Sequence, residues 1–424
     1  MSLRRAISIS VVNQVVSSGT NFALGLYLVR TLIPTEFGLY GIGFAISLIY
    51  AGIGNALFVT QMVVNMPDKP PEQRSVYAAN MGLVVATFCG STILLAWLGS
   101  QAGSAMWPEI SKYSRYGVGV AVASCSYLCK EFFVRHAYTA RRETSALAVN
   151  VAVAAALAGF LLIQHYDNAV ITATGALWIY AASHLFGTVV GQSLLRLPFR
   201  AVRGRLVRSD FRDAWKGGRW SLLTQIVYMT RAQAHILIGG PSVGATGVAY
   251  LNAARLFVTP CVMMSPALSQ VFVPRLAELR TRDPTRMVRT GRQVVLLQLT
   301  VVSAYLLLLL FAYEQISAIV LGNRYPQLLE MVVAWAVYAS LLATRNGAEI
   351  VAVATRRFRH QMLCGTASAG VTIAAVLWLV PGMGIAGAVL GLSLGEASHI
   401  VLLAAALRTQ EKEGTNDTAP HQAL

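Results

Sequence analysis

The chain contains about a dozen apolar runs, each about 20 to 28 residues long and rich in Leu, Ala and Val. A helix of this length matches the hydrocarbon thickness of a bilayer. Lipid offers no partners to backbone N–H and C=O groups, so spanning segments must be helices or closed barrels. The runs lack a period of two, which excludes a membrane barrel. The sequence therefore predicts an all-α integral membrane protein.

Composition agrees with a lipid environment. Charged residues make up 12% of the chain and hydrophobic residues 55%, whereas a soluble protein carries about a quarter charged residues. All five cysteines fall inside apolar runs and none forms a CxxC pair. We interpret them as buried free thiols and predict neither a disulfide framework nor a metal site.

We predict twelve membrane spans, six in each half of the chain. The first begins at Ile7 and is longer than the apolar core of a secretory signal, and no small-residue cleavage site follows, so it is predicted to be retained. The predicted spans cover residues 7–32, 37–64, 76–99, 113–134, 145–164, 170–195, 218–239, 246–272, 293–313, 328–353, 361–380 and 385–407.

Lys and Arg residues are concentrated in alternate connections between these spans. Connections on the side of the N-terminus hold 27 of the 34, and those on the other side hold Arg30, Lys112, Arg115 and Arg324. The positive-inside rule places both termini in the cytoplasm. The net charge of +16 is then a topogenic signal and a contact for membrane lipid headgroups, and no nucleic-acid partner is expected.

A long basic linker divides the chain into two halves. The predicted parts are a six-helix bundle at 1–195, a cytoplasmic linker at 196–219, a second bundle at 220–407, and a cytoplasmic tail without regular structure at 408–424. The halves share landmarks in the same order: Gln14 and Gln225, Gly38 and Gly247, and Pro67 and Pro274. Six spans per half predict a parallel repeat about an axis normal to the membrane.

Several ionisable residues lie in the middle of predicted spans: Arg231, Arg255, Arg345, Glu349 and Glu396. Arginine at mid-bilayer costs about 2.5–3.5 kcal/mol, so these side chains are expected to face one another or a hydrated cavity. Arg345 and Glu349 are four residues apart and could simply neutralise each other. Glu396 could pair with Arg231 or Arg255, which leaves surplus positive charge suited to an anionic substrate.

Polar residues on the spans are further candidates for lining such a cavity: Gln14, Ser17, Asn21, Gln225 and Asn252. Packing through interhelical hydrogen bonds would produce the same pattern. The two interpretations stay open.

No soluble-enzyme motif is present, and we predict that the protein is not an enzyme. A GxGxxG at Gly382, Gly384 and Gly387 is interpreted as a turn between two spans, because no βαβ unit surrounds it. The chain has no Walker A motif, which argues against a self-contained ATP-driven pump, and no cofactor is predicted. Glu349 and Glu396 are candidates for coupling transport to protons or sodium.

The segment LVRTLIPTEFGLYGIGFAI, with Leu32, Pro34, Glu36, Gly38 and Tyr40, resembles the start of Wzx-type polysaccharide flippases. GATGVAYLNAARLFVTP and LGNRYPQ resemble later elements of the same family. The family belongs to the multidrug/oligosaccharidyl-lipid/polysaccharide (MOP) exporter superfamily. The resemblance implies two six-helix bundles around a central cavity, a MATE-like fold.

The resemblance also implies a function: translocation of a polyprenyl-pyrophosphate-linked oligosaccharide across the bacterial inner membrane for O-antigen or exopolysaccharide biosynthesis, with polysaccharide polymerase and chain-length or export proteins as partners. A cation-coupled multidrug exporter of the same fold is the first alternative, although three Arg against two Glu disfavour a cationic substrate. The second alternative is a membrane glycosyltransferase or ligase, or a secretion scaffold. The longest outer stretch is only about 14 residues, which is short for the catalytic loop expected of a glycosyltransferase or ligase.

Overall fold

The computed structural model describes residues 3–106, 111–167, 170–202, 204–322, 324–355 and 358–416. Within these ranges the chain forms 13 α-helices and no β-strand, which confirms the all-α prediction. The chain divides into two compact units. Unit 1 comprises Met1–Met229 and Ala245–Asn252, and unit 2 comprises Thr230–Gly244 and Ala253–Leu424.

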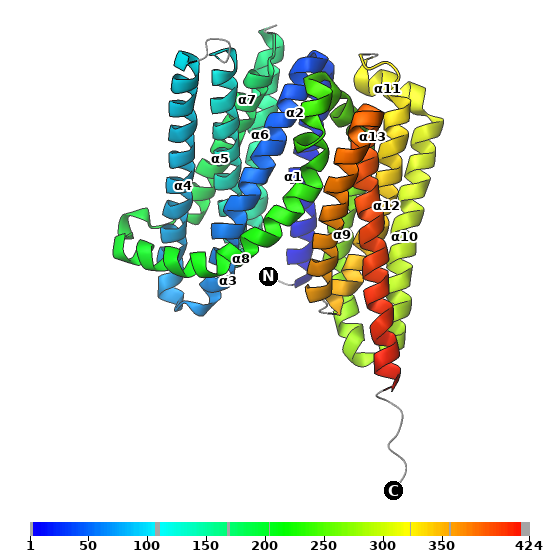
Figure 1. The fold of residues 1–424 in the computed structure, drawn as a ribbon. Coiled ribbons are helices and arrows are strands. Elements are labelled where there is room, and N and C mark those ends of the chain that lie inside the picture. Colours follow the sequence, from blue (N-terminus) through cyan, green and yellow to red (C-terminus); the bar gives the residue numbers. More distant parts are fainter. Residues whose placement is uncertain are drawn as a thin grey trace. The chain divides into compact units, whose positions relative to one another are not determined.

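In unit 1 the helices run side by side, and the first part of α8 crosses beneath them (Figure 1). Helix α5 packs against α2, α4, α6 and α7 and forms the centre of the unit. The helices are α1 (Leu3–Thr31), α2 (Pro34–Gly54), a π-helical turn (Asn55–Val59), α3 (Thr60–Asn65), α4 (Pro71–Met106), α5 (Ser111–Thr139), α6 (Glu143–Tyr166), α7 (Ala173–Leu195) and part of α8 (Gly204–Leu237).

The Leu-x-Pro-x-Glu segment has a structural role in unit 1. Pro34 occupies the first turn of α2, where its missing N–H is not needed. Glu36, in the first turn of α2, accepts a hydrogen bond from the backbone N–H of Ala173 at 2.5 Å. Because Ala173 is the first residue of α7, this carboxylate satisfies an N–H group that helix geometry leaves unpaired. The segment therefore joins the starts of two helices.

The start of α2 also lies against residues 245–252 of α9 (Gly240–Arg282). A Cβ atom on Gly38 would lie 1.7 Å from the carbonyl oxygen of Ala245, and one on Gly41 would lie 2.1 Å from Nδ2 of Asn252. Only glycine allows backbones to approach this closely. The landmark segments of the two halves thus meet within unit 1.

Unit 2 holds the end of α8 and most of α9, which is interrupted at Gly244 (φ 69°). Its other helices are α10 (Pro284–Phe311), α11 (Tyr313–Leu321), α12 (Leu329–Ala354) and α13 (Phe358–Asn416). Helix α13 turns at Gly384 (φ 56°, ψ −130°), a backbone conformation open to glycine, and so supplies two antiparallel arms. This confirms that the GxGxxG segment is a turn between helices.

The two arms of α13 pack through a seam of small residues at every fourth position: Gly387, Gly391 and Gly395. A Cβ atom on Gly387 would lie 2.5 Å from the carbonyl oxygen of Leu379 on the facing arm. Ser368 donates a hydrogen bond across the seam to the carbonyl oxygen of Gly395 at 2.7 Å. Small residues at this spacing allow close helix packing in a membrane.

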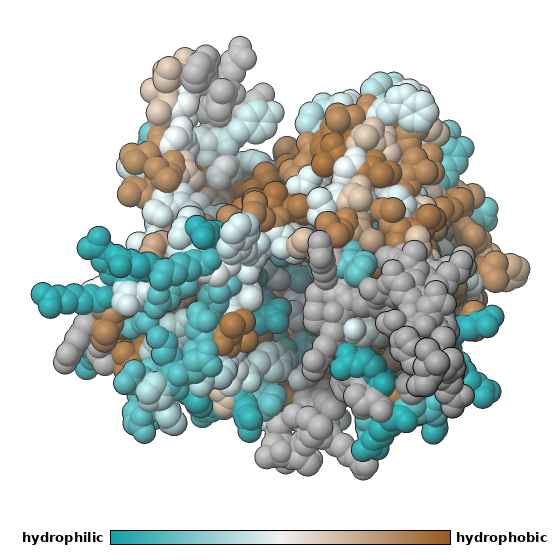
Figure 2. Space-filling view, turned by 60° about the horizontal axis from the view of Figure 1, so that its bottom comes forward, coloured by the Kyte–Doolittle hydropathy of each residue, from teal (hydrophilic) through white to brown (hydrophobic). Residues whose placement is uncertain are grey.

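Eight helices of the described part of the chain are long and apolar enough to cross a membrane. One of them, His360–Ala405, covers both arms of α13. Helices α1, α8 and α12 fall outside this group, and they carry many of the polar and charged residues singled out in the sequence. On unit 1, hydrophilic residues gather at the end where α8 begins (Figure 2).

Helical structure extends into segments that were predicted to connect or follow the spans. Residues 204–219 of the predicted linker form the first turns of α8, whose Asp210 lies 3.5 Å from Lys69 and accepts a hydrogen bond from Asn80. Residues 408–416 of the predicted tail continue α13, and residues 417–424 lie outside the described ranges. Helix α11 corresponds to no predicted span.

Candidate functional site

Three helices of unit 2 bring together five ionisable side chains, which we call the charge network. Arg231 comes from α8, Arg345 and Glu349 from α12, and Glu396 and His399 from the second arm of α13. On α12 the two residues are four apart and on α13 three apart, so each pair lies on one face of its helix. Four of the five residues are buried, and Glu349 is partly buried.

Arg345 lies between two carboxylates. Its Nη1 atom is 2.5 Å from Oε1 of Glu349, and its Nε atom is 2.5 Å from Oε2 of Glu396. The second contact is an ion pair whose angles do not meet those of a hydrogen bond. The Arg345 and Glu396 side chains are 8% and 5% exposed. Removing either charge would therefore leave the other poorly solvated.

His399 connects this pair to Arg231. The Nδ1 atom of His399 lies 2.7 Å from Nη1 of Arg231. A guanidinium group can only donate, so Nδ1 accepts and carries no proton. The neutral ring then has its proton on Nε2, which lies 3.7 Å from Oε1 of Glu349. The geometry thus assigns one tautomer to a histidine placed between an arginine and a carboxylate.

The charges of the network balance. The network contains two guanidinium groups and two carboxylates, and both carboxylates contact Arg345. Among the described residues no carboxylate lies within 4.0 Å of a side-chain nitrogen of Arg231, whose described hydrogen bond goes to the neutral histidine. An anion approaching Arg231 would therefore replace a weak neutral partner, not a carboxylate.

Arg255 lies apart from this chain of contacts. Its guanidinium carbon is 6.0 Å from the ring centre of Trp335, and the ring of His235 meets that of Trp335 edge-on at 5.4 Å. Tyr338 also packs edge-on against Trp335, with ring centres 5.2 Å apart. Arg255 is thus placed beside α12, which also carries Arg345 and Glu349 of the network.

The structure brings together four of the five ionisable residues singled out in the sequence. It pairs Glu396 with Arg345, whereas the sequence suggested Arg231 or Arg255 as its partner. The pairing of Arg345 with Glu349 on one helix is confirmed. Within the network, Arg231 is therefore the guanidinium group that contacts no carboxylate among the described residues.

The polar residues predicted to line a cavity lie in unit 1. Gln14 donates a hydrogen bond to the hydroxyl of Ser18 on its own helix at 2.9 Å, and Ser17 and Asn21 are half-buried on α1. Gln225 and Asn252 abut α2 at its glycines. The Nδ2 atom of Asn252 is buried without a hydrogen-bond partner among the described residues.

A second buried charge cluster lies in unit 1 and was missed in the sequence. Lys130 on α5 is 1% exposed, and its Nζ atom lies 2.5 Å from Oε1 of Glu131 and 3.3 Å from Oδ1 of Asn150. Asn150 donates to Asn13 on α1 at 2.8 Å, and Asn13 donates to the Tyr138 hydroxyl at 2.7 Å. Helices α1, α5 and α6 are thus joined by polar contacts.

The 27 basic residues assigned above to connections on the side of the N-terminus include Lys130, and this assignment was wrong. Helix α5 continues to Thr139, so Lys130 lies more than two turns before its end and packs beside Gly187 of α7. The signal that could have found it is the position of Lys130 inside the predicted span 113–134, next to an acidic residue. Among the described residues, no group of three or more His, Cys, Asp or Glu side chains could hold a metal ion.

The sequence matches no known protein-family profile and no curated protein. Several solved transporter structures do match. A multidrug resistance MATE family transporter of the MOP superfamily, in its inward-facing conformation, has a TM-score of 0.71 at 12% identity, over 96% of both chains. The lipid II flippase MurJ, in an inward closed conformation, has a TM-score of 0.71 at 11% identity, over 95% of this chain and 87% of that one.

The chain has the fold of the MOP-superfamily transporters. A MOP superfamily transporter from Pyrococcus furiosus Vc1, described by the reverse polarity of its binding pocket, also matches, with a TM-score of 0.60 at 12% identity over 94% of both chains. The fold and the apolar helices indicate a multi-pass membrane protein. Wzx-type specificity stays a prediction from the sequence segments quoted above.

Proposed function

We propose that the protein is a flippase that moves a polyprenyl-pyrophosphate-linked oligosaccharide across the bacterial inner membrane by alternating access. A charged, sugar-bearing head group cannot cross hydrocarbon unaided, so biosynthesis of a surface polysaccharide needs such a protein. A polysaccharide polymerase would consume the translocated unit. Both termini are placed in the cytoplasm in this proposal, as the Lys and Arg distribution predicts.

The observation that carries the proposal is the buried positive charge of Arg231. Its side chain is hydrogen-bonded to a neutral nitrogen of His399, at a residue exposure of 7%. A guanidinium group stays charged in a protein and offers paired donors that match phosphate oxygens. A pyrophosphate would form stronger, charge-assisted hydrogen bonds with Arg231 than the imidazole does.

The acidic residues of the network fit an anionic substrate better than a cationic one. Glu349 and Glu396 are both engaged with Arg345, and a cationic drug would have to compete with that arginine for them. Proton uptake by Glu396 would weaken its pair with Arg345 and change the charge balance of the whole network. We therefore propose these two carboxylates as the coupling groups for protons or sodium.

A multidrug exporter is the second candidate function. It is favoured by the match to the MATE transporter, whose TM-score of 0.71 equals that of the lipid II flippase. Under this alternative Glu349 or Glu396 would bind the drug or its counter-ion, and Arg231 would have a structural role. The two candidates thus assign the central roles to opposite charges.

Reconstituted vesicles can distinguish the two functions. Wild-type protein should translocate a fluorescently labelled polyprenyl-pyrophosphate disaccharide, measured by quenching of the label from outside. Arg231→Ala should lower the rate at least about tenfold, since one charge-assisted contact contributes about 1.5–3 kcal/mol. Arg231→Lys should retain part of the rate because it keeps the charge. The matched control is Arg292→Gln, an exposed arginine of α10.

An unchanged rate in both Arg231→Ala and Arg255→Ala would remove the cationic site from the mechanism. Vesicles that transport cationic dyes but not the pyrophosphate lipid would support the exporter instead. An unchanged rate without any ion gradient would argue against coupling through Glu349 and Glu396.

A further inference from the structure

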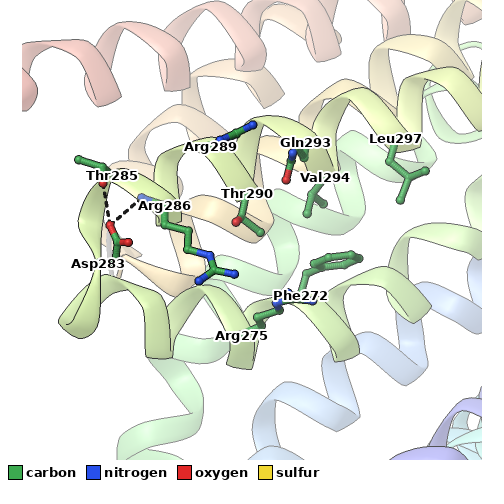
Figure 3. Close-up of a pocket in the computed structure, with 10 residues that line it drawn as sticks. All are labelled: Phe272, Arg275, Asp283, Thr285, Arg286, Arg289, Thr290, Gln293, Val294 and Leu297. Carbon is green, nitrogen blue, oxygen red and sulfur yellow. Dashed lines mark hydrogen bonds between the residues drawn. The ribbon is translucent and has the colours of Figure 1, made fainter.

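A pocket of 940 Å³ lies in unit 2 where α9 ends and α10 begins. Figure 3 shows side chains from both helices around it. The charge network takes no part in this pocket, and none of the functions considered above uses it. Its lining consists of Phe272, Arg275, Asp283, Thr285, Arg286, Arg289, Thr290, Gln293, Val294 and Leu297.

One end of the pocket is strongly basic. Arg275 comes from α9, and Arg286 and Arg289 come from the first turns of α10. None of the three forms an ion pair with another described residue within 4.0 Å, although nearby Arg282 pairs with Glu278 at 2.8 Å. Three guanidinium groups around one pocket repel one another, and a bound anion would relieve that repulsion.

Asp283 is the one acidic residue in the lining, and its carboxylate is already engaged. It caps α10 by accepting hydrogen bonds from the Thr285 hydroxyl at 2.7 Å and from the backbone N–H of Arg286 at 2.9 Å. These contacts direct the carboxylate toward the start of its own helix (Figure 3). The basic end therefore keeps a net positive charge of about two, to which the N-terminus of α10 adds.

The other end of the pocket is apolar. Phe272 and Val294 belong to a hydrophobic cluster with Leu276 and Ile350. Leu297, one turn further along α10, is 47% exposed. Eleven residues separate Arg286 from Leu297, which is about 16 Å along a helix. The lining thus changes from cationic to apolar along α10, over the length of a lipid headgroup and the start of its chain.

The pocket also lies at the end of a helix suited to cross the bilayer. Thr285–Phe311 is one of the membrane-crossing candidates, so its first turns are expected at the depth of the headgroups. Basic pockets between membrane helices bind anionic headgroups. A free nucleotide or inorganic phosphate would leave the apolar end of the pocket unused.

We propose that this pocket binds an anionic phospholipid, with its phosphate between Arg275, Arg286 and Arg289 and its acyl chain along Val294 and Leu297. The site is distinct from the proposed substrate site. It would hold a resident lipid whether the protein moves a lipid-linked sugar or another substrate.

Native mass spectrometry of the full-length protein in detergent tests this proposal. The probes are phosphatidylglycerol and phosphatidylcholine with identical acyl chains. Wild-type protein should retain phosphatidylglycerol preferentially. Each arginine near a headgroup is expected to contribute about fivefold, so Arg286→Gln with Arg289→Gln should lower the preference by about 25-fold. Arg292→Gln, on the same helix but outside the lining, should leave it unchanged.

Two further measurements distinguish a bound phospholipid from a free phosphate or pyrophosphate anion. Millimolar inorganic pyrophosphate should not displace phosphatidylglycerol, whereas Leu297→Gln should weaken retention of the lipid by removing apolar contact. Equal retention in the double arginine variant, or ready displacement by pyrophosphate, would overturn the proposal. Circular dichroism of each variant checks that the helices remain intact, and all the substituted arginines are exposed.

Discussion

Arg345 contacts both carboxylates of the charge network, so its replacement tests whether the network holds unit 2 together. Arg345→Met keeps much of the side-chain volume and removes the charge. Glu396 then has no described cationic partner, and its side chain is only 5% exposed. Glu349 is 22% exposed and can be partly rescued by water. The variant therefore leaves one strongly buried and one partly buried negative charge.

Breaking a buried ion pair by removing one partner costs about 3–5 kcal/mol. We expect Arg345→Met to lower the free energy of unfolding by that amount. Glu396→Gln leaves the pair of Arg345 with Glu349 in place and should cost about 1–3 kcal/mol. The double variant, Arg345→Met with Glu396→Gln, removes both charges of the Arg345–Glu396 pair. Its cost should fall below the sum of the single costs by at least about 1 kcal/mol.

Unfolding by sodium dodecyl sulfate in mixed micelles measures these free energies. The matched control is Arg282→Met, because Arg282 forms the same four-residue helical pair with Glu278 at an exposed position. Exposed pairs contribute about 0–1 kcal/mol, so the control should change little. Additive costs in the double variant, or a cost for Arg345→Met as small as that of the control, would refute the reasoning.

Hydrogen bonds from the Thr285 hydroxyl and the Arg286 backbone N–H lower the pKa of Asp283 in the folded protein. The Asp283 carboxylate therefore stabilises α10 above its unfolded-state pKa, and this stabilisation is lost as the pH falls through the lowered folded-state pKa. As the pH falls through that pKa, protection of the first amides of α10 from hydrogen exchange should decrease in the wild type. The Asp283→Ala variant, which lacks the carboxylate, should show no such decrease. Gly387→Val should cost about 1–3 kcal/mol by overpacking against the facing arm, measured by thermal unfolding, whereas Gly370→Val, whose added Cβ meets no atom within 4 Å, should leave the packing unchanged. Lys130→Met should lower the yield of folded protein measured by size-exclusion chromatography, because it leaves the Glu131 carboxylate buried without its partner. Adding Glu131→Gln should restore part of the yield. No restoration would show that the Lys130–Glu131 pair does not matter for folding.

The helical layout was predictable from hydropathy and turn chemistry. Pro34 and Pro284 stand in the first turns of α2 and α10, and Gly384 turns α13 back on itself, each as local backbone preferences indicate. The extent of α8 was not predictable in this way. Its first turns are too polar to read as a membrane span, and they are helical because Asp210, Phe211 and Ala214 pack on the end of unit 1.

Only part of the candidate site could be predicted from the sequence. The pair of Arg345 and Glu349 follows from helical spacing on one element. The contact of Arg345 with Glu396 depends on the register between α12 and α13, which no local pattern encodes. Lys130 was misassigned because its charge was counted toward a connection, although it lies inside an apolar run. Contacts between helices decide such cases, and a single sequence carries little information about them.

Two buried cations of this protein, Lys130 and Arg345, each have a carboxylate close by on the same helix. Lys130 adjoins Glu131 on α5, and Arg345 lies one turn from Glu349 on α12. A lone Lys or Arg at the centre of an inserting helix costs about 2.5–3.5 kcal/mol. Because the counter-charge arrives with the same segment, each helix can leave the translocon already neutralised. Partners from later helices, Asn150 for Lys130 and Glu396 for Arg345, then join once those segments have been synthesised. Neither of these two cations therefore has to wait unpaired in lipid during biogenesis.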